Sequence, residues 1–323
     1  MLLMDLYSVI FNKFGRLRSG WRLAIYILAF IALWVLLETF VRIIYLAART
    51  LIPSHPYASY FANVAYRFTL LGAGLGAGYF CVRLLENLPW RSLGLTMHQR
   101  WVRDLIVGTA IGVAAVAFAV AIATAAGGLQ FTFIGNEMLL AAGRSLLTAG
   151  VLLFVAALAE EAAFRGYPLQ TLTRAGLMWL GVILTSVPFG FAHLWNPNVV
   201  PGITFANTVI AGFWLAAAYL KTRSLWFPLG VHWGWNWALG SIFGLPISGV
   251  RFFSNPILRG QDVGPAWLTG GNYGIEGGVA GTAALIAFTL LIWRTRLVAP
   301  TQELLKLTSE ENPATTPRVS IRS

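Results

Sequence analysis

Charged residues and cysteines are scarce in this chain of 323 residues. Asp, Glu, Lys and Arg together make up 11% of it, whereas hydrophobic residues make up 57% and the mean hydropathy is +0.69. Soluble domains contain about 25% charged residues, so this composition excludes an ordinary soluble protein. Cys81 is the only cysteine, which excludes an internal disulfide and a Cys-x-x-Cys metal or redox pair. The sequence therefore predicts an integral membrane protein with several spans.

Several common catalytic and binding motifs are also missing. The sequence has no Gly-x-Ser-x-Gly nucleophile turn and no His-Glu-x-x-His zinc helix. A glycine run at residues 72–78 is not followed by the Gly-Lys-Ser or Gly-Lys-Thr of a phosphate-binding loop. Gly72 and Gly76, like Gly74 and Gly78, have the spacing of small residues at contacts between membrane helices. The run therefore predicts close helix packing.

Apolar runs of about 20 residues, each long enough to cross a bilayer, recur along the chain. We expect eight transmembrane helices, near residues 22–46, 65–87, 104–126, 145–172, 176–196, 202–220, 224–245 and 275–295. The predicted fold class is therefore all-α, a polytopic membrane helix bundle.

The segments around these runs suggest how the chain is divided. We expect an interfacial N-terminal segment at residues 1–21, a membrane bundle at residues 22–299 and a disordered tail at residues 300–323. The long loop at residues 246–274 either caps the bundle or simply connects two helices.

The net charge of +11 comes from Lys and Arg residues grouped between the apolar runs. Most of these groups fall on alternate connections, on the same side as the two ends of the chain. The positive-inside rule therefore predicts that both termini are cytoplasmic, and we expect the plasma (inner) membrane as the location. Because the basic residues form no continuous tract interleaved with aromatics, nucleic acid is not an expected partner.

Two adjacent glutamates, Glu160 and Glu161, interrupt the apolar run at residues 145–172. A carboxylate near the bilayer centre costs about 2.5–3.5 kcal/mol on insertion scales, so a doubled one indicates a need for charge or for a proton. Arg165 follows Glu161 by one helical turn and can pair with it, while Glu160 points about 100° away. A purely structural ion pair of Glu161 with Arg165 is the simpler interpretation.

Two of the four histidines, His193 and His232, also lie within predicted spans, and Asn236 shares a helix face with His232. Each of these side chains alone could simply hydrogen-bond a neighbouring helix. Together with the glutamates they provide the groups that activate a water and stabilise an oxyanion, or that hold a metal. Whether a cofactor binds stays open; if a metal such as zinc does, the expected ligands are Glu161, His193 and His232.

At these positions the chain resembles the CPBP family of intramembrane proteases, which includes type II CAAX prenyl endopeptidases and bacteriocin-processing (Abi-type) proteins. The family motif E-E-x-x-x-R is similar to residues 160–165, F-x-x-x-H to residues 189–193 and H-x-x-x-N to residues 232–236. The motifs occur in the family's order on separate spans. The resemblance covers residues 145–240, inside an expected protease core at residues 145–245.

The resemblance implies a helical bundle whose site is a membrane cavity open to the cytoplasm. It implies hydrolysis of a peptide bond in a lipidated or membrane-embedded peptide. In this family Glu160 and His193 would activate the water, His232 and Asn236 would stabilise the oxyanion, and the rest of the first motif would orient Glu160. The family is commonly described as metalloendopeptidases, although the same residues also allow a metal-free, glutamate-dependent reaction.

Two other functions remain open from the sequence. A proton-coupled transporter also has carboxylates and histidines at the bilayer midplane, but inverted repeats with paired broken helices are not evident. A non-catalytic immunity or scaffolding protein would not depend on Glu160.

The depth of the site residues is one difficulty for the sequence interpretation. Counted from the cytoplasmic ends at about 1.5 Å per residue, Glu161 lies about 18 Å deep, His232 about 13 Å and His193 about 25 Å. An interfacial start of the span at residues 176–196, a tilt, or a break near Pro188 would bring His193 back to the others. We expect the interfacial start.

Overall fold

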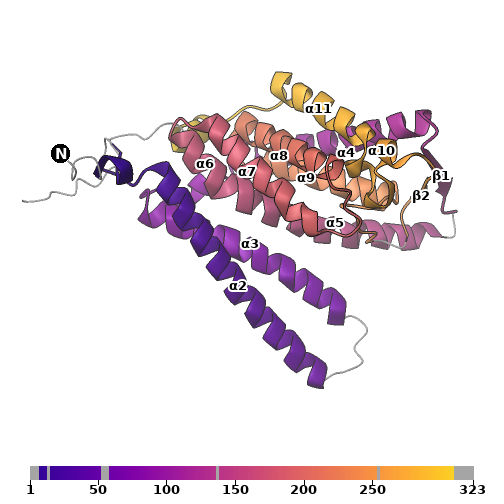
Figure 1. The fold of residues 1–323 in the computed structure, drawn as a ribbon, viewed down its shortest axis with the longest axis horizontal. Helices are drawn as coiled ribbons and strands as arrows, with labels where there is room; N and C mark the ends of the chain where they lie inside the picture. Colours follow the sequence, from indigo (N-terminus) through magenta and orange to yellow (C-terminus); the bar gives the residue numbers. More distant parts are fainter. Residues whose placement is uncertain (1–6, 13–14, 52–57, 136–137, 253–254, 309–323) are drawn as a thin grey trace, which may run out of the picture.

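The computed structural model describes residues 7–12, 15–51, 58–135, 138–252 and 255–308. The architecture is an all-α membrane bundle with very little sheet (Figure 1). The longer helices are α2 (Ser19–Leu51), α3 (Ala58–Leu84), α4 (Trp101–Ala125), α5 (Leu139–Glu161), α7 (Met178–Ala192), α8 (Ile203–Thr222), α9 (Trp226–Trp237) and α11 (Val279–Arg294). The short elements are η1 (Trp90–Leu93), η3 (Ala162–Gly166), α6 (Tyr167–Arg174), η4 (His193–Trp195), η5 (Ala238–Ile242), α10 (Ala266–Thr269), η6 (Gly271–Tyr273), η7 (Ile275–Gly277) and α12 (Gln302–Thr308).

Among the described residues, five helical segments are long and apolar enough to cross a membrane. They are Ser19–Thr50, Trp101–Ala125, Leu139–Arg174, Met178–Trp195 and Ile203–Thr222. The other three predicted spans coincide with α3, α9 and α11, of which α11 is apolar but has only 16 residues. The all-α membrane bundle is therefore confirmed, and the number of eight crossings stays a prediction.

The helices α2 and α3 form a pair that diverges from α5 and α7 (Figure 1). Only 6% of the apolar span in α2 is buried inside the protein. Large apolar side chains are exposed along it, including Leu28, Val35, Leu36, Phe40 and Ile43. Such a surface is unfavourable in water and suits a hydrocarbon environment, so α2 is a lipid-facing helix.

The helices α4 and α9 pack backbone to backbone through glycines. The glycines of this contact are Gly108, Gly112, Gly230 and Gly234. A Cβ on Gly112 would overlap the carbonyl oxygen of Val231, and one on Gly230 would overlap that of Leu105. Each helix thus contributes a Gly-x-x-x-Gly pair, the spacing that lets membrane helices approach closely. This contact fixes α9, which carries two of the predicted site residues.

The segment at residues 246–274 is folded onto the bundle. Its strand β2 (Leu258–Asp262) pairs antiparallel with β1 (Leu129–Phe133), so that Phe131 lies opposite Gly260. The backbone N–H of Gly249 donates to the carbonyl of Tyr273 at 2.9 Å. Of the two interpretations of this loop, the structure favours a cap.

The structure tests the predicted interfacial segment and the predicted disordered tail only in part. Residues 302–308, inside the segment predicted to be disordered, form α12, which packs against η1 and α6 because Leu304 is buried there. Residues 309–323 lie outside the described residues, as do residues 1–6 and 13–14 of the predicted interfacial segment.

Candidate active site

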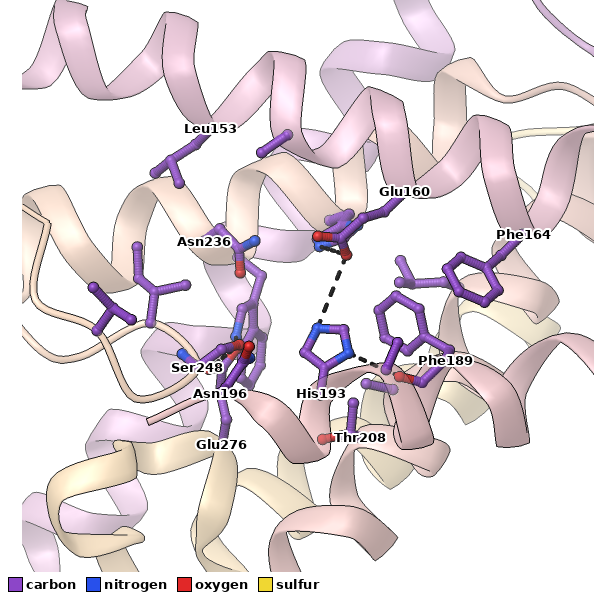
Figure 2. Close-up of a pocket in the computed structure, with 18 of the residues that line it drawn as sticks. Leu153, Glu160, Phe164, Phe189, His193, Asn196, Thr208, Asn236, Ser248 and Glu276 are labelled. Carbon is purple, nitrogen blue, oxygen red and sulfur yellow. Dashed lines mark hydrogen bonds and ion pairs between the residues drawn. The ribbon is translucent and has the colours of Figure 1, made fainter. Parts of the chain in front are cut away.

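Glu160 lies near the C-terminal end of α5, where it lines a cavity of about 350 Å³. Side chains from α2, α3, α5, α7, α8 and α9 and from the cap segment form the walls. Figure 2 shows Glu160, His193 and Asn236 directed into this cavity from different helices. Most lining residues are apolar, so the few polar groups converge in surroundings typical of a binding or catalytic site.

Two imidazole rings face the carboxylate of Glu160. Oε2 of Glu160 is 4.0 Å from Nε2 of His193 and 3.8 Å from Nε2 of His232. Both distances are too long for a direct hydrogen bond, and they match a contact bridged by one water molecule. This Oε2 atom is shielded from solvent and has no hydrogen-bond partner among the described residues. The structure therefore brings three of the predicted site residues around one point.

Glu161 points away from this oxygen and is completely buried. Its Oε1 accepts a hydrogen bond from Nη1 of Arg165 at 3.2 Å and lies 2.9 Å from Nδ1 of His232. Arg165 also donates to the carbonyl of Gly212 at 3.2 Å, and its guanidinium lies 4.5 Å from the ring centre of Phe189. The ion pair expected from the sequence is thus present. It holds the ring of His232 so that Nε2 turns toward Glu160.

His193 is oriented by the end of its own helix. Its Nδ1 is 2.8 Å from the carbonyl oxygen of Phe189, while its backbone N–H bonds to Gly190 instead. In the neutral ring Nδ1–H donates to this carbonyl, which leaves Nε2 as an acceptor. His232 has the same tautomer when Glu161 is ionised, because Nδ1–H then donates to the carboxylate. Both rings therefore present a lone pair toward the cavity.

The depth problem is resolved by where the helices begin. From Arg174 back to Glu160 the rise is about 21 Å, and from Met178 to His193 it is about 22 Å. Helix α7 starts two residues later than predicted and continues unbroken through Pro188. No break at this proline is needed to bring His193 level with Glu160.

Helix α9 starts inside the bundle, which brings His232 to the same level. The N–H of Leu225 donates to the carbonyl of Gly94, and its Cδ1 is 4.0 Å from where a Cβ on Gly166 would lie. The start of α9 is therefore level with Gly166, about 12 Å from Arg174 along α6. Counting from the loop that precedes α9 underestimates the depth of His232 for this reason.

A π-helical turn directly follows the site residues on two helices. The turn η3 follows Glu161 on α5, and η5 follows Trp237 on α9. Such wide turns are rare, and they occur frequently at functional sites. Apolar periodicity does not reveal them in the sequence.

Residues 142–238 match a family model described as type II CAAX prenyl endopeptidase, Rce1-like. This stretch is therefore similar to that family, and the match supports the resemblance to CPBP intramembrane proteases seen in the sequence. Searches of curated proteins and of solved structures gave no match.

The metal ligands expected from the sequence, Glu161, His193 and His232, stay a prediction. Oε1 of Glu161 is engaged by Arg165 and by Nδ1 of His232. Its Oε2 has no hydrogen-bond partner among the described residues. Among the described residues, no group of three or more His, Cys, Asp and Glu side chains is placed to hold a metal ion.

Two charged residues that line the same cavity were missed in the sequence, Arg67 and Glu276. Oε1 of Glu276 accepts a hydrogen bond from Nε1 of Trp235 at 2.9 Å, and Oε2 accepts one from Oγ of Ser248 at 3.1 Å. Glu276 thus ties the cap segment to α9. Both residues lie within predicted spans, and a lone intramembrane charge is the signal that could have found them.

Proposed function

We propose that this protein is an intramembrane endopeptidase that hydrolyses a peptide bond of a lipidated or membrane-embedded peptide with a water activated by Glu160 and His193. The observation that carries the proposal is the pair of imidazole Nε2 atoms at 4.0 and 3.8 Å from Oε2 of Glu160. The carboxylate of Glu160 and Nε2 of a neutral His193 face one another as acceptors, so a water that donates a hydrogen to each of them fits between the two.

In the first step of the proposed reaction, the water oxygen attacks the carbonyl carbon of the scissile peptide bond. The carboxylate of Glu160 takes the proton of this water, and Nε2 of His193 orients the water through its second hydrogen. The apolar walls exclude bulk water from the site.

In the second step the tetrahedral intermediate collapses. His232 and Asn236 donate hydrogen bonds to the oxyanion, and a preorganised donor of this kind contributes about 2.7–4 kcal/mol. Because Nδ1–H of His232 already donates to ionised Glu161, His232 acts as this donor in its imidazolium form, with a proton on Nε2 that it carries before the reaction begins and keeps throughout. The carbon–nitrogen bond breaks, and the proton held by Glu160 passes to the leaving amine.

The test is cleavage of a fluorogenic lipidated peptide by purified protein. We expect Glu160→Gln, Glu160→Ala and His193→Ala to lower turnover by about 10²–10⁴-fold, the usual contribution of a general base. Glu38→Gln, which changes an exposed glutamate on α2, is the matched control and should retain full activity. A loss of turnover supports the proposal only in a variant that unfolds at the wild-type temperature. Undiminished turnover in all three site variants contradicts the proposal.

Cytoplasmic termini and a plasma-membrane location belong to the same proposal. A transporter or a non-catalytic partner is not favoured, because the family match implies a protease. Flux of a solute into proteoliposomes under a pH gradient, with no peptide cleaved, would support the transporter instead.

A further inference from the structure

Arg67 is a charged residue within the membrane part of α3 that lines the cavity around Glu160. An arginine at this depth costs about 2.5–3.5 kcal/mol on insertion scales, so such residues usually pair with another group or serve a function. Its side chain is only partly exposed, and among the described residues it has no hydrogen bond or ion pair. Its charge does act on the carboxylate of Glu160.

The other charged groups of the cavity face protein groups of their own. Glu276 is hydrogen-bonded to Trp235 and Ser248, and Glu160 faces His193 and His232. Arg67 therefore leaves guanidinium N–H groups for an anion that enters the cavity. A carboxylate is the anion that this planar donor binds best, through two parallel hydrogen bonds.

Most of the other side chains that line the cavity are apolar, among them Leu70 of α3, one turn from Arg67 on the same helix face. An apolar cavity that contains a cation without a partner suits a short apolar peptide end that terminates in a carboxylate. A phosphate or an acidic peptide would bring further charges into this apolar cavity without partners.

We propose that Arg67 binds the C-terminal carboxylate of the peptide substrate and so selects chains that end inside the cavity. The proposal rests on the peptidase function above and names its specificity-determining residue. The enzyme then recognises chain ends, because a peptide whose carboxylate is blocked, or whose chain continues, leaves the guanidinium in the cavity without a partner.

The test compares two S-farnesylated peptides ending in Cys-Val-Ile-Met, one with a free C-terminal carboxylate and one with a C-terminal amide. We expect the wild-type kcat/KM for the acid to exceed that for the amide by about 10–100-fold, the range for a charge-assisted hydrogen bond. Arg67→Gln should remove this preference by slowing cleavage of the acid alone. Arg67→Lys should restore part of it. Arg42→Gln, an exposed arginine on α2, is the matched control and should keep the preference.

A role of Arg67 through Glu160 alone gives a different result. Arg67→Gln would then slow cleavage of the acid and the amide equally, and the preference would persist. That outcome, or a wild-type enzyme that cleaves both peptides equally well, overturns the proposal.

A binding measurement tests recognition of the carboxylate independently of the peptidase function. Fluorescence titration with the same two peptides, N-methylated at the scissile bond, measures affinity without cleavage. Tighter binding of the acid by wild type but not by Arg67→Gln supports carboxylate recognition even if no peptide is cleaved. Equal affinities for acid and amide contradict it.

Discussion

At the scale of single residues, the two adjacent glutamates have different roles because they lie at opposite nitrogen atoms of one histidine ring. Glu161 contacts Nδ1 of His232, whereas Glu160 faces Nε2 of the same ring. Neighbouring positions on a helix point about 100° apart, so two consecutive carboxylates can reach opposite edges of one imidazole. A single glutamate at either position could not both orient the ring and leave a free carboxylate in the cavity.

The buried ion pair of Glu161 with Arg165 leads to a prediction about stability. Both side chains are fully buried, so Arg165→Met leaves an uncompensated carboxylate and should destabilise the protein by about 3–5 kcal/mol. The double variant Glu161→Gln with Arg165→Met removes both charges and should recover most of this loss. Thermal unfolding in detergent measures both, with exposed Arg42→Met as control. A double variant no more stable than the single one would contradict the pairing.

The catalytic candidates were the most predictable part of the site. Glu160, His193 and His232 stand out in the sequence because each is an ionisable group inside an apolar run. Arg67 and Glu276 are equally isolated, but they belong to none of the three motifs, so only the three-dimensional cavity connects them to the site. Side-chain convergence across helices is a tertiary property that spacing along one helix does not contain.

At the scale of secondary-structure elements, the contact between α4 and α9 should be the most sensitive to added volume. Gly112→Ala or Gly230→Ala places a methyl group against a carbonyl of the other helix and must push the two apart. Because α9 carries His232 and Asn236, activity should fall even when the protein still folds, by about 10²-fold for a displacement near 1 Å.

The matched control for this contact is Gly143→Ala on α5, where an added Cβ would meet nothing within 4 Å. Peptidase activity and unfolding temperature, measured together for the three variants, separate the effects. Wild-type activity in Gly112→Ala and Gly230→Ala would show that the glycines are not required for close packing.

The helices themselves were predicted well, and their ends were not. Apolar runs located α4, α5, α7 and α8 because twenty apolar residues have few alternatives to a membrane helix. The inward start of α9 depends on the loop at Gly94, which occupies the space below it. Contacts of this kind, like the two π-helical turns, leave no periodic signal in the sequence.

At the scale of the whole molecule, the bundle has two different ends. One end carries α6 and, packed on it, α12; the opposite end carries the two-stranded sheet of β1 and β2 (Figure 1). The positive-inside rule predicts that the α6 end is cytoplasmic. In this orientation α6 and α12 face the cytoplasm, and the sheet of β1 and β2 faces the outer side of the membrane.

Cysteine labelling tests this orientation, because the chain has a single cysteine. Cys81 is fully buried, so a Cys81→Ala background provides an unreactive start for Gln302→Cys on α12 and Gln130→Cys on β1, both exposed positions. A membrane-impermeant maleimide should label Gln130→Cys in intact cells and Gln302→Cys only in inverted vesicles. Labelling of Gln302→Cys from outside intact cells would reverse the topology.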